Sequence, residues 1–269
     1  MAKALSGRTA LVTGSTSGIG LAIAKALAGE GTRIAINGFG TPEQIADAEA
    51  ALKAAGAPEV KYFNADLTDQ PAIDRMMDAV LAWAGKLDIL VNNAGMQVTA
   101  SIATMPVETW QKIIALNLSA CFYTLRRALP GMMERGFGRV INIASVHGLV
   151  ASVEKAPYVS SKFGLVGLTK VAALEAAPAG TRDSGGVTVN AICPGWVETA
   201  LIEPQIQARA AKFSGDREAG VRDLVKEKEP SQRMATPDDI GALALFLCSN
   251  AAHNITGAAI PVDGAWTAQ

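Results

Sequence analysis

The sequence has few of the residues that build disulfide frameworks or metal centres. Its 269 residues include three cysteines and two histidines, His147 and His253, which stand far apart. Three cysteines cannot form a disulfide framework, and no Cys-x-x-Cys pair or close histidine pair supplies metal-ligand spacing. The composition therefore excludes a secreted disulfide-rich mini-protein and a zinc module, and we expect no bound metal.

An excess of charge of one sign and long hydrophobic runs are also missing. The chain has 24 Lys+Arg against 25 Asp+Glu, a net charge of −1, and no run rich in Lys or Arg. This balance argues against nucleic acid and anionic membranes as partners. No window approaches the roughly 18 uninterrupted apolar residues of a membrane span. The first eight residues are too polar to begin a signal peptide, so we expect a cytoplasmic protein.

Two kinds of segment alternate along the chain. Short β-branched and aliphatic runs predict strands at residues 9–12, 33–37, 60–64, 89–91, 139–143, 188–192 and 259–262. Segments of helical period lie near residues 19–29, 42–55, 71–84, 107–135, 158–176 and 237–249. Strands with little polar alternation, separated by helices, indicate an α/β fold whose parallel sheet is covered on both faces. With no repeat and no long linker, residues 1–269 are predicted to form one domain.

Two segments fall outside this alternation. Residues 177–186 form a loop rich in Gly and polar residues between a predicted helix and strand. Residues 198–230 are a charged, helix-prone excursion that follows Cys193-Pro194-Gly195 at the carboxyl end of a strand. Ligands of parallel sheets bind at that end, and long insertions there are often binding loops.

A glycine-rich turn follows the first predicted strand. It reads Thr13-Gly14-Ser15-Thr16-Ser17-Gly18-Ile19-Gly20 and leads directly into a helix. Glycines at such a turn let the backbone approach a pyrophosphate, which the helix amino terminus then attracts through its free N–H groups. The spacing differs from the commoner Gly-x-Gly-x-x-Gly, but its place in the chain favours nucleotide binding over a purely structural turn.

The second predicted strand ends at Asn37-Gly38-Phe39, where the adenosine ribose of a dinucleotide is read. A 2′-phosphate would need an Arg or Lys here or in the glycine-rich turn, and neither place has one. The acidic residue that usually binds the ribose hydroxyls is missing as well. The absence of cations favours NAD over NADP.

Tyr158 and Lys162 are one helical turn apart, on one face of a predicted helix. A phenol has a reference pKa near 10, and a neighbouring ammonium lowers that value by stabilising the phenolate. Such a pair alone is more often a solvated helix face. Here Ser145 follows a buried strand, and Asn117 lies within an apolar helical stretch, where it needs partners and could kink the helix around a water.

The chain resembles the short-chain dehydrogenase/reductase family. The motifs that carry the resemblance occur in the family's order over nearly the whole chain: residues 13–20, Asn92-Asn93-Ala94-Gly95, Asn117, Ser145, Tyr158 with Lys162, and Pro194-Gly195. The resemblance implies a single-domain, Rossmann-like, doubly wound parallel sheet of order 3-2-1-4-5-6-7. It also implies a helical substrate lid at about residues 198–230, a nicotinamide cofactor and a homotetramer.

The resemblance further implies residue roles. Ser145 would hold the substrate oxygen, and Tyr158 would exchange its proton. Lys162 would bind the nicotinamide ribose and lower the pKa of Tyr158, and Asn117 would hold a water that relays protons to Lys162. The implied cofactor-binding residues are Gly14, Thr16, Ser17, Gly18, Ile19, Phe39, Asp66, Leu67, Asn93, Ala94, Gly95, Tyr158, Lys162, Pro194, Gly195 and Val197.

A narrower resemblance is to the bacterial members of this family that oxidise short 3-hydroxy acids with NAD. It is carried by residues 37–40, 93–97, 144–152, 193–197 and 262–267. It implies a substrate carboxylate bound by Gln97, His147, Lys155 and Gln205, beside Ser145, Tyr158 and Trp196. A cation among neutral donors suits a small hydroxy acid. The expected reaction is the reversible oxidation of (R)-3-hydroxybutyrate to acetoacetate.

Other interpretations of these residues and of the function stay open at this point. His147 alone is more often a core histidine bonded to a backbone carbonyl, Lys155 alone is usually solvated, and Trp196 either fills a core or walls a small pocket. Rival functions are another reductase of this family, acting on a 3-oxoacyl thioester or a sugar, and a non-catalytic NAD sensor. Three features depart from the family pattern: the longer 177–186 loop, Ala265 in place of a glycine, and the charged 198–230 segment.

Overall fold

Seven parallel strands form a single sheet in the computed structural model, which describes residues 3–268. The strands are β1 (Thr9–Val12), β2 (Arg33–Ile36), β3 (Val60–Tyr62), β4 (Ile89–Asn92), β5 (Phe137–Ile143), β6 (Gly186–Pro194) and β7 (Ala259–Val262). Their spatial order is β3-β2-β1-β4-β5-β6-β7, which confirms the expected Rossmann-like topology. The predicted strands all exist, and their ends differ from the predicted ones by two residues at most.

Both faces of the sheet are buried, because neighbouring strands align apolar residues in rows. One row runs from Ala35 of β2 through Leu11 and Leu90 to Val140 and Val189. These five residues belong to the hydrophobic cluster on one face, whereas the adjacent isoleucines and valines of the same strands belong to the cluster on the other. The lack of polar alternation in the sequence reflects this double burial.

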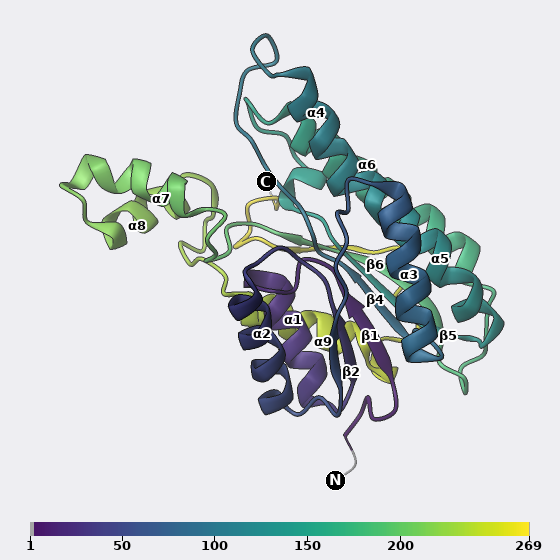
Figure 1. Ribbon diagram of the computed structural model, residues 1–269. Coiled ribbons are helices and arrows are strands. Elements are labelled where there is room, and N and C mark those ends of the chain that lie inside the picture. Colours follow the sequence, from purple (N-terminus) through teal and green to yellow (C-terminus); the bar gives the residue numbers. More distant parts are fainter. Residues whose placement is uncertain (1–2, 269) are drawn as a thin grey trace.

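Helices cover the two faces separately (Figure 1). On one face lie α1 (Gly18–Gly29), α2 (Pro42–Ala55) and α9 (Pro237–Cys248), and on the other α3 (Gln70–Ala84), α5 (Ala120–Glu134) and α6 (Ala156–Ala176). The Thr-Pro signals mark helix starts as expected. Thr41 and Thr236 each form a capping box, with Gln44 and Asp239 respectively.

The long helix predicted over residues 107–135 is not a uniform α-helix. It consists of α4 (Val107–Ile114), a π-helical segment η1 (Ala115–Ser119) and α5. Asn117, the polar residue that drew attention in the sequence, is fully buried inside η1. A π-helical turn widens the helix locally, and such turns are frequent at functional sites.

The 198–230 segment forms two helices that project away from the sheet (Figure 1). These are α7 (Glu203–Ala210) and α8 (Arg217–Lys228), joined by a short 3-10 turn, η3 (Ala211–Phe213). Their small apolar core contains Ile202, Ile206 and Leu224. The segment is helical, as the sequence predicted, and the structure adds that its two helices share an apolar core.

The 177–186 loop lies at the opposite end of the sheet. Ser184 Oγ donates a hydrogen bond of 2.8 Å to the carbonyl of Gly136, which directly precedes β5. The guanidinium of buried Arg139 donates to the carbonyls of Gly185 and Gly186, at 3.1 and 2.9 Å. The additional residues of this loop thus pack at the amino end of the strands, away from their carboxyl ends.

Candidate active site

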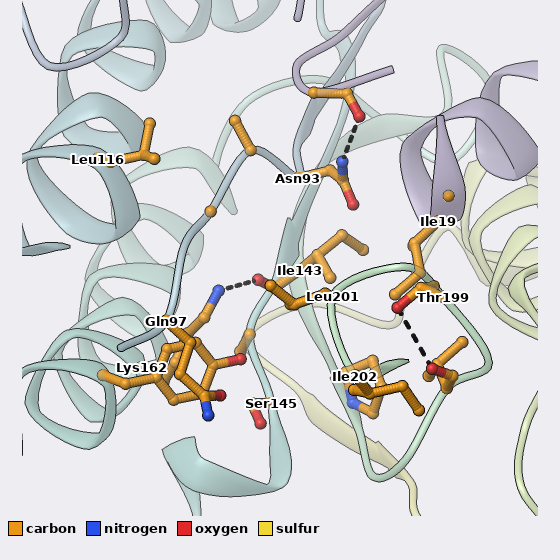
Figure 2. Close-up of a pocket in the computed structure, with 18 of the residues that line it drawn as sticks. Ile19, Asn93, Gln97, Leu116, Ile143, Ser145, Lys162, Thr199, Leu201 and Ile202 are labelled. Atoms are coloured by element: carbon orange, nitrogen blue, oxygen red, sulfur yellow. Dashed lines mark hydrogen bonds between the residues drawn. The ribbon is translucent and has the colours of Figure 1, made fainter. Parts of the chain in front are cut away.

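A cavity of about 430 Å³ opens at the carboxyl ends of β1, β4, β5 and β6. Most of the residues that the sequence singled out line it: Gly14, Thr16, Ser17, Gly18, Ile19, Phe39, Leu67, Asn93, Ala94, Gly95, Gln97, Ser145, His147, Lys155, Tyr158, Lys162, Pro194, Gly195, Trp196 and Val197. Figure 2 shows Gln97, Lys162 and Ser145 gathered on one side, with Thr199 and Ile202 across the cavity. The tertiary structure therefore brings the glycine-rich turn and the candidate reacting groups into one space.

The glycine-rich turn is shaped to approach an anion closely. Gly14 has a φ of 61°, and a Cβ there would lie 2.9 Å from Ala94 Cα. Asn93 fixes the turn, since its Nδ2 donates hydrogen bonds of 2.9 Å to the carbonyls of Thr13 and Gly14. Ser17 makes no side-chain cap to α1, so the first turn of that helix offers its N–H groups to a ligand. These features fit the pyrophosphate of a dinucleotide.

The end of β2 provides an uncharged surface for the rest of such a cofactor. Asn37 is buried and donates from Nδ2 to the carbonyls of Phe63 and Ala65, so its side chain is already used. Thr16 Oγ1 donates to the Phe39 carbonyl at 2.8 Å, and the Phe39 side chain is 74% exposed at the rim of the cavity. No Lys or Arg lines this part of the cavity.

Of the two predicted cofactor-binding residues Asp66 and Leu67, the structure places one at the cavity. Leu67 lines the cavity and is buried. Asp66 does not line it: its Oδ1 accepts hydrogen bonds from the Thr68 N–H and hydroxyl, at 2.8 and 2.7 Å. Those bonds lower the pKa of the Asp66 carboxyl. The Asp66 side chain thus orders its own turn.

Tyr158, Ser145 and Lys162 meet at the inner end of the cavity. The Lys162 ammonium is buried, donates a 2.7 Å hydrogen bond to the Ile143 carbonyl and lies 5.6 Å from the centroid of the Tyr158 ring. Burial lowers the pKa of Lys162 to about 8. The expected lowering of the Tyr158 pKa by Lys162 is not found: burial raises that pKa, and a hydrogen bond with Ser145 partly opposes it.

Asn117 contacts this group only indirectly. Its Oδ1 accepts from the Met96 N–H and its Nδ2 donates to the Met96 carbonyl, both at 2.9 Å. Nδ2 also lies 3.3 Å from the hydroxyl of Ser161, one residue before Lys162. Asn117 does not line the cavity. The Asn117 side chain therefore links the loop after β4, at Met96, to α6, at Ser161.

His147 is buried against aromatic rings and lacks hydrogen-bond partners. It is 3% exposed, and neither Nδ1 nor Nε2 has a partner in the described part of the chain. The interpretation as a core histidine bonded to a backbone carbonyl is therefore wrong. Its ring lies 5.9 Å from that of Tyr158 and 5.5 Å from that of Trp266, between centroids. Burial, with nearby Lys155 and Lys228, lowers the pKa of His147 to about 4 and keeps the ring neutral.

Lys155 and Trp196 form the neighbouring wall. The Lys155 ammonium lies 5.2 Å from the centroid of the Trp196 ring, a cation–π arrangement, and partial burial lowers its pKa. Lys155 is thus not the fully solvated residue that it would be by default. Trp196 serves both interpretations, because it lines the cavity and packs against the apolar core of the 198–230 segment. Gln205, on α7, does not line the cavity.

Trp266 is a cavity residue that the sequence analysis did not select. It is 9% exposed, and its ring lies 5.7 Å from that of Trp196. Asp263 builds the turn that carries it, accepting hydrogen bonds from the Ala265 and Thr267 N–H groups at 3.1 and 2.9 Å. Ala265 has a φ of 73°, where a glycine would be unstrained. The signal in the sequence that could have identified Trp266 is the turn-forming pair Asp263-Gly264, which precedes it.

Several features bear on other classes of site. Within residues 3–268 no cluster of three or more His, Cys, Asp or Glu side chains could hold a metal ion. In the same range, no helix combines the length and hydrophobicity needed to cross a bilayer. All three cysteines are buried and reduced, and burial raises the pKa of the Cys193 thiol to about 11. Cys193 is therefore a buried apolar residue and a poor nucleophile.

Comparison with known proteins places this geometry in a family. A family model described as enoyl-(acyl carrier protein) reductase matches residues 14–267. The chain is 52% identical to D-beta-hydroxybutyrate dehydrogenase of Cupriavidus necator, over 98% of this chain and 100% of that protein. It is 45% identical to D-beta-hydroxybutyrate dehydrogenase of Rhizobium meliloti, over 97% and 99%.

Solved structures agree with the sequence matches. The crystal structure of a short-chain type dehydrogenase/reductase from Mycobacterium marinum superposes with a TM-score of 0.85 at 30% identity, covering 100% of this chain and 98% of the other. Three findings point to one family of oxidoreductases that use nicotinamide cofactors. These are the fold, the cavity at the carboxyl ends of the strands, and the similarity to two dehydrogenases over nearly the full length of the chain. The chain belongs to the short-chain dehydrogenase/reductase family.

Proposed function

We propose that this protein catalyses the reversible, NAD-dependent oxidation of (R)-3-hydroxybutyrate to acetoacetate. The observation that carries the proposal is the charge of the cavity. Among the described residues, its lining contains Lys155 and Lys162 but no Asp or Glu, and two of the lining side chains hold buried nitrogens without partners: His147 Nδ1 and Nε2, and Trp196 Nε1. The neutral His147 ring and the Trp196 indole each hold one N–H without a partner inside the protein, which fits a ligand rich in acceptor oxygens, such as a short carboxylate.

The carboxylate of the substrate would lie between Lys155, His147 and Gln97. Lys155 supplies the positive charge, and neutral His147 donates one N–H while it retains one acceptor nitrogen. Gln97, on the loop after β4, adds an amide donor. The indoles of Trp196 and Trp266 confine the methyl end, which suits a four-carbon acid. Gln205 would join this set only if α7 moved toward the cavity.

The reacting end of the substrate would lie between Ser145 and Tyr158. Ser145 holds the hydroxyl oxygen, and Tyr158 accepts the hydroxyl proton as the alcohol becomes a ketone. Lys162 binds the ribose next to the nicotinamide and offsets the charge on Tyr158 when the phenolate forms. Asn117 keeps Met96 and Ser161 in place behind these groups. When bound, NAD supplies the acceptor for the hydride that leaves the carbinol carbon.

The preference for NAD over NADP is part of the proposal. The rim of the cavity near Phe39 has no Arg or Lys to neutralise a 2′-phosphate. A Cβ on Gly38 would lie 2.7 Å from Thr16 Oγ1, so the backbone there is tightly fixed. Burying a doubly charged phosphate at this surface without a cation would be unfavourable.

The names of the relatives support the same reaction, since two of them are D-beta-hydroxybutyrate dehydrogenases. The test is a spectrophotometric assay of NADH formation from (R)-3-hydroxybutyrate, with its (S)-enantiomer, NADP, a 3-oxoacyl thioester and sugars compared in parallel. We expect the (R)-acid with NAD to give the highest kcat/KM. Preferred reduction of a thioester or a sugar would replace this proposal with a rival activity of the family. No turnover of any substrate would favour an NAD-binding sensor.

A further inference from the structure

A buried carboxyl group joins the 198–230 segment to the sheet. Glu229, directly after α8, is 2% exposed, and its Oε1 accepts a 2.7 Å hydrogen bond from the N–H of Trp196. Its second oxygen, Oε2, is buried with no partner in the described residues. No step in the proposed reaction uses Glu229, and it does not line the cavity.

Two glycines make room for this carboxyl group. A Cβ on Gly195 would lie 2.3 Å from Glu229 Oε1, and a Cβ on Gly264 would lie 3.3 Å from Oε2 and 3.1 Å from the Glu229 Cβ. Gly195 directly follows β6, and Gly264 comes two residues after β7. The carboxyl group therefore fills a slot between the carboxyl ends of two neighbouring strands, and larger residues at either position would close that slot.

The slot lies behind two walls of the substrate end of the cavity. On the β6 side, Trp196 donates its main-chain N–H to Glu229, and its side chain packs against Ile202 and Ile206 of the 198–230 segment. On the β7 side, the turn that begins at Asp263 carries Trp266. The main chain strengthens the junction, because the Ser231 N–H donates to the Gly264 carbonyl at 3.0 Å.

We propose that Glu229 is a positioning residue, whose carboxyl group fastens the end of α8 between β6 and β7 and thereby holds Trp196 and Trp266 around the substrate. The part of this inference that concerns substrate rests on the proposed function. The part that concerns the fastening of α8 does not, because it follows from the slot and the Trp196 hydrogen bond alone.

The charge state of Glu229 decides how well this contact holds. Burial and the neighbouring Asp263 carboxylate raise the pKa of Glu229 to about 7, and the Trp196 N–H opposes the rise. Asp263, in the turn after β7, is the charged group that acts on Glu229 across the slot. Lys228, the last residue of α8, directly precedes Glu229. A raised pKa means that the contact is strongest below about pH 4.5 and is lost as the pH rises to about 7, because the opened segment ionises first and ionisation in place leaves a buried anionic oxygen without a partner.

The experiment compares Glu229→Ala and Glu229→Gln with Glu218→Ala, which changes a glutamate in the first turn of α8 whose side chain is 87% exposed. The first readout needs no substrate. Trypsin is added to the folded protein, and cleavage after Arg209, Lys212 and Arg217 is followed over time. We expect Glu229→Ala to be cleaved at least about fivefold faster than wild type and Glu218→Ala at the wild-type rate, because opening of the segment limits cleavage.

The second readout separates substrate from cofactor. For Glu229→Ala we expect KM for (R)-3-hydroxybutyrate to rise about tenfold while Kd for NAD stays within about twofold. In the wild type this KM should rise between about pH 5 and about pH 7, whereas Glu229→Gln, which keeps the acceptor oxygen without a charge, should show a flat profile over that range.

The outcomes are distinguishable. Faster cleavage of Glu229→Ala supports the fastening role even if the wild type turns over no hydroxy acid, a result that would end the proposed function alone. Wild-type cleavage and wild-type KM in Glu229→Ala would overturn the inference. So would equal losses of NAD and substrate binding, or a Glu229→Gln variant that keeps the wild-type pH profile of KM.

Discussion

The imidazole of His147 stands edge-on to the phenol ring of Tyr158, with centroids 5.9 Å apart and ring planes inclined by 68°. His147, which we propose binds the substrate carboxylate, and Tyr158, which we propose accepts the substrate hydroxyl proton, are thus neighbours. The part of a substrate that joins these two groups can be only a few atoms long. This spacing favours a short hydroxy acid over a long acyl thioester, which has no carboxylate at that distance from its reacting oxygen.

Removal of the Tyr158 hydroxyl tests the proposed proton acceptor. Tyr158→Phe should keep NAD binding and lower kcat at least about a hundredfold, since positioned proton transfer contributes roughly 10²–10⁴ to rate. NAD affinity is measured by calorimetry on the same preparation, to show that the cavity is intact. A folded Phe variant with turnover near that of the wild type would end the proposed mechanism.

Removal of the carboxylate ligands should matter more for the acid than for its ester. Lys155→Ala and His147→Ala should each lower kcat/KM for 3-hydroxybutyrate about ten- to a hundredfold, which corresponds to losing about 1.5–3 kcal/mol of hydrogen bonding to a charged group. Gln97→Ala should lose less. The methyl ester, which carries no charge, is the matched substrate control. Equal losses for acid and ester would mean that Lys155 and His147 support the fold or the cofactor instead.

The lowered pKa of His147 predicts a pH dependence of stability. The pKa of about 4 in the folded protein lies below the ordinary histidine value of 6.5, so the unfolded chain takes up a proton first as the pH falls. The stability contribution is complete above pH 6.5 and is lost as the pH falls toward 4, by about 2–3 kcal/mol. Urea unfolding at several pH values should show a smaller loss for His147→Gln than for the wild type. The control is His253→Gln, a like substitution outside the cavity; an identical acid response in His147→Gln would refute the prediction.

A cation placed at the rim of the cavity should change the cofactor preference. Phe39 is 74% exposed beside Thr16, so Phe39→Arg can be made without filling buried space. The guanidinium would pair with a 2′-phosphate, and the ratio of kcat/KM for NADP to that for NAD should rise at least about tenfold. Stability, followed by thermal melting, should stay near that of the wild type. An unchanged ratio would place the adenosine ribose elsewhere.

The predicted homotetramer finds support in exposed apolar side chains. On α5 and α6 these are Phe122, Met133, Phe163, Val171 and Leu174, of which Leu174 is 76% exposed. Apolar patches of this kind mark interfaces, and closed symmetric assemblies are usual among enzymes. Light scattering at micromolar concentration should give the mass of four chains, and Leu174→Asp should reduce it. Phe213→Asp, in the 198–230 segment, is the control; a monomeric wild type would contradict the prediction.

Local sequence determined the elements and their order. The capping boxes at Thr41 and Thr236 begin helices where the Thr-Pro pairs predicted them, because a cap and its helix lie within four residues. The glycine-rich turn at Gly14 could be recognised because its backbone conformation is a property of the turn itself. The candidate site residues were then chosen from family motifs. Most of these residues line the same cavity in the structure, so they are neighbours in space.

Only the tertiary structure decided which side chains share an environment. Gln205 lies on α7 outside the cavity, Asp66 turns to Thr68, and Asn117 binds the Met96 main chain. Trp266 enters the cavity from the end of the chain. None of these placements follows from spacing along the sequence, since each depends on contacts between elements that are distant in the chain.

Glu229 illustrates the physical reason. In the sequence it is one of many charged residues of the 198–230 segment, and a glutamate in such a segment is typical of a solvated surface position. In the structure it occupies a slot between Gly195 and Gly264, which are 69 positions apart in the numbering. Periodicity records which side of an element is apolar. Whether a carboxyl group is exposed or enclosed depends on how three separate segments meet, and that is fixed only when the whole chain packs.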